Sequence, residues 1–189
     1  MHTIEYVSVP FTTPFHEQLI EGSRINIHGK VHTHHHKDFA VELLSGPNIV
    51  LHVNFRFHHH EHTLVLNASS YGTWGPEIRV HNPLHDGDHF HLHIHVHHSH
   101  YNIEVNGTRV AEFPHRYPFF TVQALGIRGG VEVQKIHFEG FPFRNNWNSG
   151  SYDYGHGGYI GYGTESYVQP NWSESHEYNQ HFGHHHHHH

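Results

Sequence analysis

Apolar and polar residues alternate strictly in many short runs of this sequence, and that alternation limits the possible folds more than any other feature. Successive side chains of a β-strand point to opposite faces of a sheet, so each run predicts a strand with one buried face. Asn106-Gly107 and Gly129-Gly130 are strong turn signals between such runs. No stretch has convincing helical periodicity, so the sequence predicts an all-β antiparallel sandwich or barrel. The predicted strands are Arg24 to Val31, Phe39 to Leu44, Ile49 to Phe57, His62 to Asn67, Glu77 to Val80, His89 to His97, Tyr101 to Asn106, Phe119 to Ile127 and Glu132 to Glu139.

The alternation stops at Arg144, where the composition changes. Residues 1–143 carry most of the Ile, Leu and Val, whereas residues 144–183 are rich in Gly, Tyr, Asn and Ser. The second region predicts a disordered low-complexity tail, and both a solvated tail and self-association through its aromatic residues stay open. These aromatic residues include Trp147, Tyr152, Tyr154, Tyr159, Tyr162, Tyr167, Trp172 and Tyr178. The run 184–189 consists of histidine alone and is interpreted as an expression tag.

Several classes of function are disfavoured by what the sequence lacks. The 10 Lys and Arg residues are not clustered and the formal net charge is −7, which does not favour nucleic-acid binding. No apolar run is long enough for a transmembrane helix, and no Sec-type signal peptide is visible. The absence of cysteine excludes disulfides and thiolate metal sites. No phosphate loop, nucleophile elbow or dinucleotide fingerprint occurs, and His60-Glu61-His62 lacks the spacing of a helical zinc site, so we do not expect an enzyme.

One polar cluster stands out among the predicted strands. In the run from Leu51 to Phe57, His52, Asn54 and Arg56 alternate with apolar residues and therefore share one face, roughly 6.5–7 Å apart. If the following strands pair in order, further polar and aromatic residues line the same exposed sheet face. These are Asn67, Trp74, Glu77 and Arg79.

This set of residue types is suited to a carbohydrate. A sugar hydroxyl both donates and accepts hydrogen bonds; His and Arg donate, Glu accepts, and Asn does both. An exposed Trp offers a flat apolar surface for the C–H face of a hexose. Glycoside hydrolysis usually needs two free carboxylates, whereas Glu77 is the one acid expected in this cluster. We expect Arg56 or Arg79 to pair with Glu77 and to hold it ionised.

The motifs in which these residues occur resemble those of galectins. The signature H-x-N-x-R is present as His52, Asn54 and Arg56, the downstream Asn is Asn67, and W-G-x-E-x-R is present from Trp74 to Arg79. The resemblance extends over residues 10–141. Flanking features that fit are Gly22, Ile25-Asn26-Ile27-His28-Gly29, Val105-Asn106-Gly107 and Phe113-Pro114-His115-Arg116.

The resemblance implies a galectin-like antiparallel β-sandwich (a jelly roll) of roughly five and six strands, with residues 1–143 as its carbohydrate-recognition domain. Its concave sheet would bind β-galactosides of the lactose and N-acetyllactosamine type, without calcium or another required cofactor. By analogy, His52, Asn54 and Arg56 would contact the axial O4 of galactose. Asn67 and Glu77 would hold O6, Trp74 would stack on the ring, and Arg56, Glu77 and Arg79 would reach the neighbouring sugar.

The family also implies partners and a location. The partners would be β-galactoside glycans on glycoproteins or glycolipids, and the protein would be cytoplasmic, or extracellular after non-classical secretion, or both. Because one site cannot crosslink cells, agglutination would need a homodimer or tail-mediated self-association.

Three departures from the family pattern affect the expected site. Phe55 stands where the family commonly has Pro, and the loop from Phe57 to Thr63 is short, so a preference for longer glycans is not predicted. Asn67-Ala68-Ser69 forms a glycosylation sequon. A sugar attached there would block the pocket, so we predict that Asn67 is unmodified.

The most unusual feature is histidine, of which the chain has 32, the tag included. Five of them (His89, His91, His93, His95 and His97) alternate with apolar residues and form a ladder on one strand face. The family's strand order places this strand in the convex sheet, with His28 on one flank and Asn102 and Glu104 on the other.

Three interpretations of this histidine ladder stay open. The imidazoles fill ordinary solvent positions, they capture Zn²⁺, Cu²⁺ or Ni²⁺ as an adventitious or regulatory site, or they make the surface charge depend on pH. The alternative to a galactoside lectin is accordingly a histidine-rich metal-binding protein on a lectin scaffold, with weak or lost sugar binding.

Overall fold

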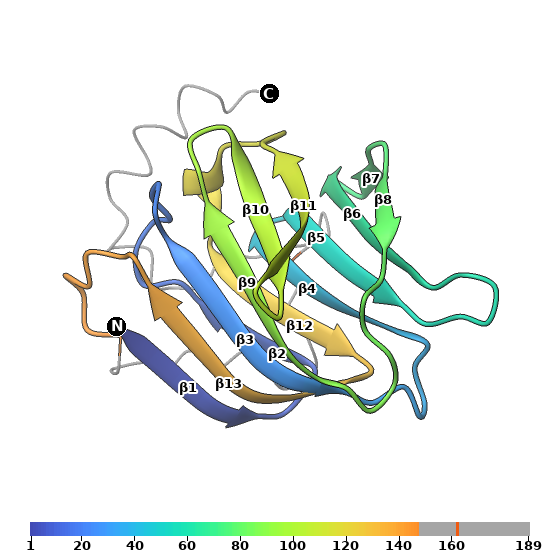
Figure 1. Cartoon of the computed structure of the whole chain (residues 1–189). Coiled ribbons are helices and arrows are strands. Elements are labelled where there is room, and N and C mark those ends of the chain that lie inside the picture. The colour runs from blue at the N-terminus through green and yellow to red at the C-terminus, as the bar shows by residue number, and fades with distance from the viewer. Residues whose placement is uncertain (148–161, 163–189) are drawn as a thin grey trace.

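The computed structural model describes residues 1–147 and residue 162, which form two antiparallel β-sheets packed face to face (Figure 1). One sheet has six strands in the order β1-β13-β3-β9-β10-β11. The other has seven, in the order β2-β12-β4-β5-β6-β7, with β8 also paired to β6. Their bounds are β1 His2–Val7, β2 Phe11–Pro14, β3 Arg24–Val31, β4 Asp38–Ser45, β5 Asn48–Arg56, β6 Thr63–Ser70, β7 Thr73–Trp74, β8 Ile78–His81, β9 His89–Val96, β10 His100–Val105, β11 Thr108–Pro114, β12 Ala124–Gly129 and β13 Val131–Glu139.

The predicted all-β sandwich is confirmed, although each sheet has one strand more than the rough expectation of five and six. The four unpredicted strands, β1, β2, β7 and β11, are at the margins of the sheets or are short. Within the described residues β1 pairs with β13 alone, at the edge of its sheet, and its residues show no regular buried stripe. The run predicted from Phe119 to Ile127 begins instead as a 3₁₀ turn, Phe119–Thr121. Pro118, which precedes this turn, has no N–H to donate to a strand ladder.

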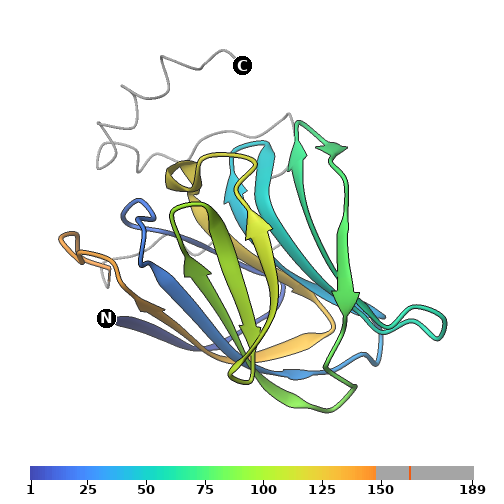
Figure 2. The same cartoon turned by 45° about the horizontal axis from the view of Figure 1, so that its top comes forward.

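The core lies between the two sheets, where the apolar members of the alternating runs meet. Leu51, Val53 and Phe55 of β5 are fully buried, and Phe90 of β9 packs from the opposite sheet. The Phe39 ring joins the two layers, with its centroid 4.8 Å from that of Phe55 and 5.4 Å from that of Phe90. The two sheets enclose this core between them (Figure 2). The packing therefore directs the polar members of β5 and β9 to the two outer faces of the sandwich.

The chain continues to pack on the sandwich beyond the expected domain boundary at residue 143. The Glu17 carboxylate accepts backbone N–H groups from Phe143, Arg144 and Asn145. Trp147, which the sequence assigned to the tail, is 5% exposed and belongs to the main core. Apart from 144–147 and 162, the expected tail and tag lie outside the described residues.

Within the part of the chain that the structure describes, no helix has the length and apolar character to cross a membrane.

Candidate functional site

The seven predicted site residues lie on or beside β5, β6, β7 and β8, on the outer face of the seven-stranded sheet. These four strands lie at one side of that sheet (Figure 1). Antiparallel register sets their positions, because it pairs His52 with Asn67 across β5 and β6 and Val65 with Arg79 across β6 and β8. The segment between β6 and β8, which contains the two-residue strand β7, carries Trp74 beside His52 and Glu77 beside Arg56. Strand alternation and local pairing therefore produce the cluster that the sequence predicted.

His52 is fixed from behind by a buried carboxylate. Its Nδ1 is hydrogen-bonded to Glu42, which faces it across β4 and β5 and whose side chain is fully buried. Arg128 of β12 donates to the same carboxylate through Nε and a terminal nitrogen, at 3.3 Å each. Burial alone would raise the pKa of Glu42, but hydrogen bonding and charge at His52 and Arg128 outweigh it and lower the pKa. Because an ionised carboxylate can only accept, His52 must donate through Nδ1, which leaves Nε2 as the nitrogen that can meet a ligand.

Trp74 forms the apolar part of the site. It is 46% exposed, a high value for a tryptophan, and its ring centroid lies 4.7 Å from that of His52 at an interplanar angle of 57°. The two-residue strand β7 pairs Trp74 with Ser69 of β6 and so holds the indole beside the polar row. An exposed aromatic face next to hydrogen-bonding groups suits a ligand with one apolar and several polar surfaces.

Asn54 is oriented by three contacts and is almost completely buried. Its Nδ2 donates to the Asp38 carboxylate at 3.0 Å and to the Phe39 carbonyl oxygen at 3.1 Å. Its Oδ1 accepts from Nε of Arg56 at 2.8 Å. The amide orientation is therefore determined, and it fixes one edge of the Arg56 guanidinium.

Two arginines and two glutamates form an ion-pair network at the exposed end of the site. Arg56 donates to Glu61 at 3.1 Å and lies 3.6 Å from Glu77. Arg79 donates to Glu77 at 2.7 Å and also binds Glu61. The hydrogen bond from Arg79, supported by Arg56, holds the pKa of Glu61 below its usual value. The expected pairing of Glu77 with an arginine is present, and both arginines take part.

A second arginine-centred contact positions the loop that carries Glu77. Nδ2 of Asn67 donates to the Gly75 carbonyl oxygen at 2.8 Å, and its Oδ1 accepts from Arg116 at 2.8 Å. Arg116 also donates to the Pro76 carbonyl oxygen at 2.7 Å. A Cβ at Gly75 would lie 2.9 Å from the Arg116 guanidinium, so a larger residue there would displace that group. The engaged amide nitrogen and 3% exposure of Asn67 are consistent with the expectation that this sequon is unmodified.

The sequence identified the outer residues of the site but missed those that support them. Glu77 is not the one acid of the cluster, since Glu61, Glu42 and Asp38 also contact its members. A signal for Glu42 existed, because it is the single charged residue in the apolar run from Phe39 to Leu44. Arg116 was noted only as part of a flanking motif, since its contacts connect segments far apart in the sequence.

Four of the five ladder histidines lie in β9 and His97 directly follows it, on the outer face of the other sheet, as the sequence predicted. Phe90, Leu92 and Ile94 point into the core, and β3 and β10 flank the strand with the expected neighbours. Among the described residues no group of three or more His, Asp or Glu side chains has a geometry that could hold a metal ion.

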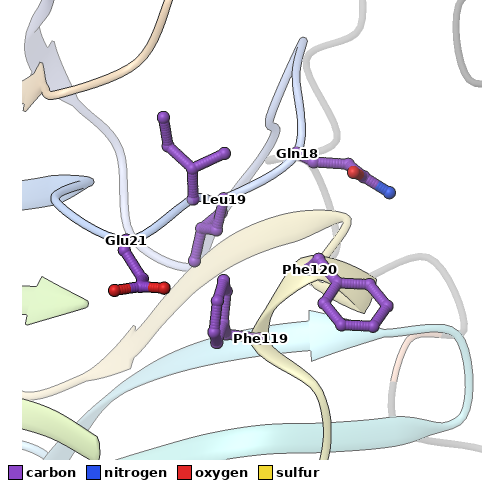
Figure 3. A pocket seen from close by; sticks show the side chains of 6 residues that line it. Gln18, Leu19, Glu21, Phe119 and Phe120 are labelled. Atoms are coloured by element: carbon purple, nitrogen blue, oxygen red, sulfur yellow. The ribbon is translucent and has the colours of Figure 1, made fainter. Parts of the chain in front are cut away.

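A separate groove of about 320 Å³ lies between the loop after β2 and the 3₁₀ turn (Figure 3). Leu19 and Phe119 form its apolar walls, and Glu21 lies at its margin, within 3.1 Å of a ring nitrogen of His98. None of the seven predicted residues lines it, so it is separate from the polar cluster.

The chain is similar to known proteins in both sequence and structure. The sequence matches the family described as galactoside-binding lectin over residues 10–138, a range that includes all seven residues. It is 53% identical over 182 residues to "Probable galaptin lec-8" of Caenorhabditis elegans, covering 96% of this chain and 100% of that protein. "Probable galaptin lec-7" of the same organism is 44% identical over 147 residues, covering 78% of this chain and 82% of that protein. The solved structure of the C. elegans galectin LEC-6 superposes with a TM-score of 0.69 at 29% identity, covering 73% of this chain and 96% of that one.

Proposed function

The chain belongs to the galactoside-binding lectin family, and from that premise we propose that it binds β-galactosides of the lactose and N-acetyllactosamine type without calcium. Proteins of this family are carbohydrate-binding lectins and not enzymes. The observation that carries the proposal is the single outer face on which His52, Trp74 and the Arg56 network lie together. The proposed galactoside site is this face, made of the seven residues His52, Asn54, Arg56, Asn67, Trp74, Glu77 and Arg79.

Each group has a proposed role that follows from its chemistry. His52 accepts a hydrogen bond from the axial O4 hydroxyl of galactose through Nε2, while Arg56 donates to the same oxygen. Trp74 packs against the C–H face of the ring, and Asn67 and Glu77 contact O6. An equatorial O4, as in glucose, would leave His52 and Arg56 without their partner, which opposes binding at a partly desolvated site.

The support behind these residues favours binding by a prearranged surface. Glu42 orients His52, Asp38 orients Asn54, and Arg116 holds the loop beside Asn67. Side chains that are already ordered lose little rotational freedom when the sugar binds, which lowers the entropic cost of association.

The remaining features of the protein are proposed from the family and the composition. We propose residues 1–143 as the recognition domain and 144–183 as a low-complexity tail. The partners would be glycoproteins or glycolipids, with agglutination through a homodimer or the tail. The protein would act in the cytoplasm, outside the cell after non-classical secretion, or in both places.

Calorimetric titration with lactose and N-acetyllactosamine tests the proposal, with cellobiose as the sugar that differs at O4. We expect saturable binding of the galactosides, none of cellobiose, and loss of binding in Trp74→Ala. Tyr6→Ala is the matched control, because Tyr6 is an exposed aromatic residue on the other sheet. Binding that survives in Trp74→Ala, or that is lost equally in Tyr6→Ala, would contradict the assigned site.

A further inference from the structure

The outer face of the six-stranded sheet, opposite the proposed galactoside site, is covered with imidazoles. The ladder of β9 supplies one row, and the register places His28 of β3 beside His91 and His137 of β13 beside Asn26. His100 of β10 stacks on His97, with ring centroids 4.8 Å apart. We call this surface the histidine face; its imidazoles are His28, His89, His91, His93, His95, His97, His100 and His137, all exposed or half-buried.

The fixed charges on the same face nearly cancel. The strands β1, β3, β10, β11 and β13, which surround the ladder, carry both signs on this side. The positive side chains are Arg24, Lys30, Arg109 and Lys135, and the negative ones are Glu5, Glu104, Glu112, Glu132 and Glu139. With neutral imidazoles the face is therefore close to uncharged, and with protonated imidazoles it is strongly positive. Protonation of histidine thus decides the sign of this surface.

The close packing of the rings disfavours protonation of His28, His91, His93 and His95. His28 stacks on His91 with centroids 4.2 Å apart, and the rings of His95 and His97 are separated by the same distance. Burial lowers the pKa of His28, His91 and His95. Neighbouring imidazoles and cations reinforce the shift at His28 and His95, whereas Glu104 opposes it at His91 and His95. Burial also lowers the pKa of His93, although the carboxylates Glu104 and Glu139 oppose the shift. Adjacent imidazolium rings would repel one another, so full protonation favours a partner that supplies negative charge.

We propose that in acid the histidine face binds an anionic lipid bilayer. The charges are spread in two dimensions, with side chains roughly 6.5–7 Å apart along a strand and strands about 4.8 Å apart. A plane of anionic headgroups matches such an array, whereas a linear polyanion follows a single row. Because the proposed galactoside site lies on the opposite sheet, a protein bound in this way keeps that site facing away from the bilayer.

Binding and protonation are linked in this arrangement. An anionic surface favours the charged imidazoles, so it raises their proton affinity, and protonation in turn strengthens binding to the surface. The association should therefore take up protons from solution. It should also weaken with added salt, because the attraction is between exposed charges.

The test is co-sedimentation of tag-free, full-length protein with vesicles of phosphatidylcholine and phosphatidylserine in equal parts, at pH 7.4 and 5.5, in the presence of EDTA. We expect binding at pH 5.5, little at pH 7.4, and none to pure phosphatidylcholine. Each cation near an anionic bilayer strengthens binding about fivefold, so replacing His91, His93 and His95 by Thr should weaken it about a hundredfold. The matched control replaces His34, His35 and His36, three exposed loop histidines, by Thr and should bind like the wild type.

A gain-of-function variant makes the test independent of folding losses. His91→Lys with His95→Lys places permanent charges on the face and should bind the same vesicles at pH 7.4 about 25-fold more tightly than the wild type. Equal binding at both pH values, an unaffected threonine variant, or a lysine variant without gain would each overturn the proposal. So would competition by lactose, or binding to heparin without binding to vesicles. Calorimetry with lactose, run separately, decides the sugar proposal and does not depend on this result.

Discussion

Replacing Glu42 by Ala tests whether a buried carboxylate sets the chemistry of the proposed galactoside site. Glu42 fixes the proton of His52 on Nδ1, so its removal allows the tautomer in which Nε2 carries the proton and can no longer accept from a sugar hydroxyl. The loss of one hydrogen bond of about 1.5 kcal/mol weakens binding roughly tenfold. We therefore expect the lactose Kd of Glu42→Ala to rise by roughly a factor of ten in calorimetry.

The control variant is Glu42→Gln, which keeps the shape and one acceptor oxygen and should recover part of the lost affinity. Removing the carboxylate also removes its ion pair with Arg128, so urea unfolding must confirm that both variants are folded. If folded Glu42→Ala bound lactose as tightly as the wild type, the assignment of a positioning role to Glu42 would be wrong.

The lowered pKa of Glu42 also determines how this residue affects stability at different pH. Its contribution to the free energy of unfolding is present above the pKa of the carboxyl group in the unfolded chain. That contribution is lost as the pH falls through the lower pKa of the folded protein.

Three further predictions follow from other contacts. Arg116→Ala removes the hydrogen bonds that hold Asn67 and the Pro76 carbonyl, so calorimetry should show lactose binding weakened by roughly tenfold; Arg116→Lys should recover little, because an ammonium cannot replace the two-pronged contact. Trp147→Ala should destabilise the fold by about 3–5 kcal/mol in urea unfolding, since the indole is part of the main core; a change below about 1 kcal/mol would contradict that packing. Because the pKa values of His91, His93 and His95 are lowered in the folded protein, the unfolded chain binds more protons in acid. The free energy of unfolding should therefore fall as the pH drops below the ordinary histidine pKa of about 6.5. Replacing these three histidines by Thr should reduce the difference in free energy of unfolding that urea titrations measure between pH 7.4 and pH 5.5.

The outer residues of the site were predictable because they depend on local geometry. Alternation from Leu51 to Phe57 determines which side chains of β5 leave the core, and one short turn brings Trp74 back beside β6, the next strand. The same reasoning placed the histidine ladder, whose aliphatic neighbours are buried. In both cases the two-residue period of a strand is enough to predict which side chains face outward, without knowledge of long-range contacts.

The supporting residues were not predictable in the same way because their partners are distant in the sequence. Arg128 reaches Glu42, and Arg116 reaches Asn67, only after non-neighbouring strands have paired in a particular register. Trp147 lies at the beginning of the region of tail-like composition, yet it packs against the core. Amino-acid composition characterises a segment as a whole. The position of one aromatic residue depends instead on whether the folded domain offers an apolar surface close to it.

The two outer faces of the sandwich differ in the pH range over which their charges change. On the face of the proposed galactoside site, ion pairs and hydrogen bonds lower the pKa of Glu42 and Glu61, so both stay ionised throughout the range in which histidine takes up protons. On the histidine face the charged carboxylates and cations nearly cancel, and the imidazoles alone determine the sign. Mild acid therefore changes the charge of one face while the carboxylates that organise the other keep theirs, so a single domain can engage a second surface without rearranging the ion pairs of the first.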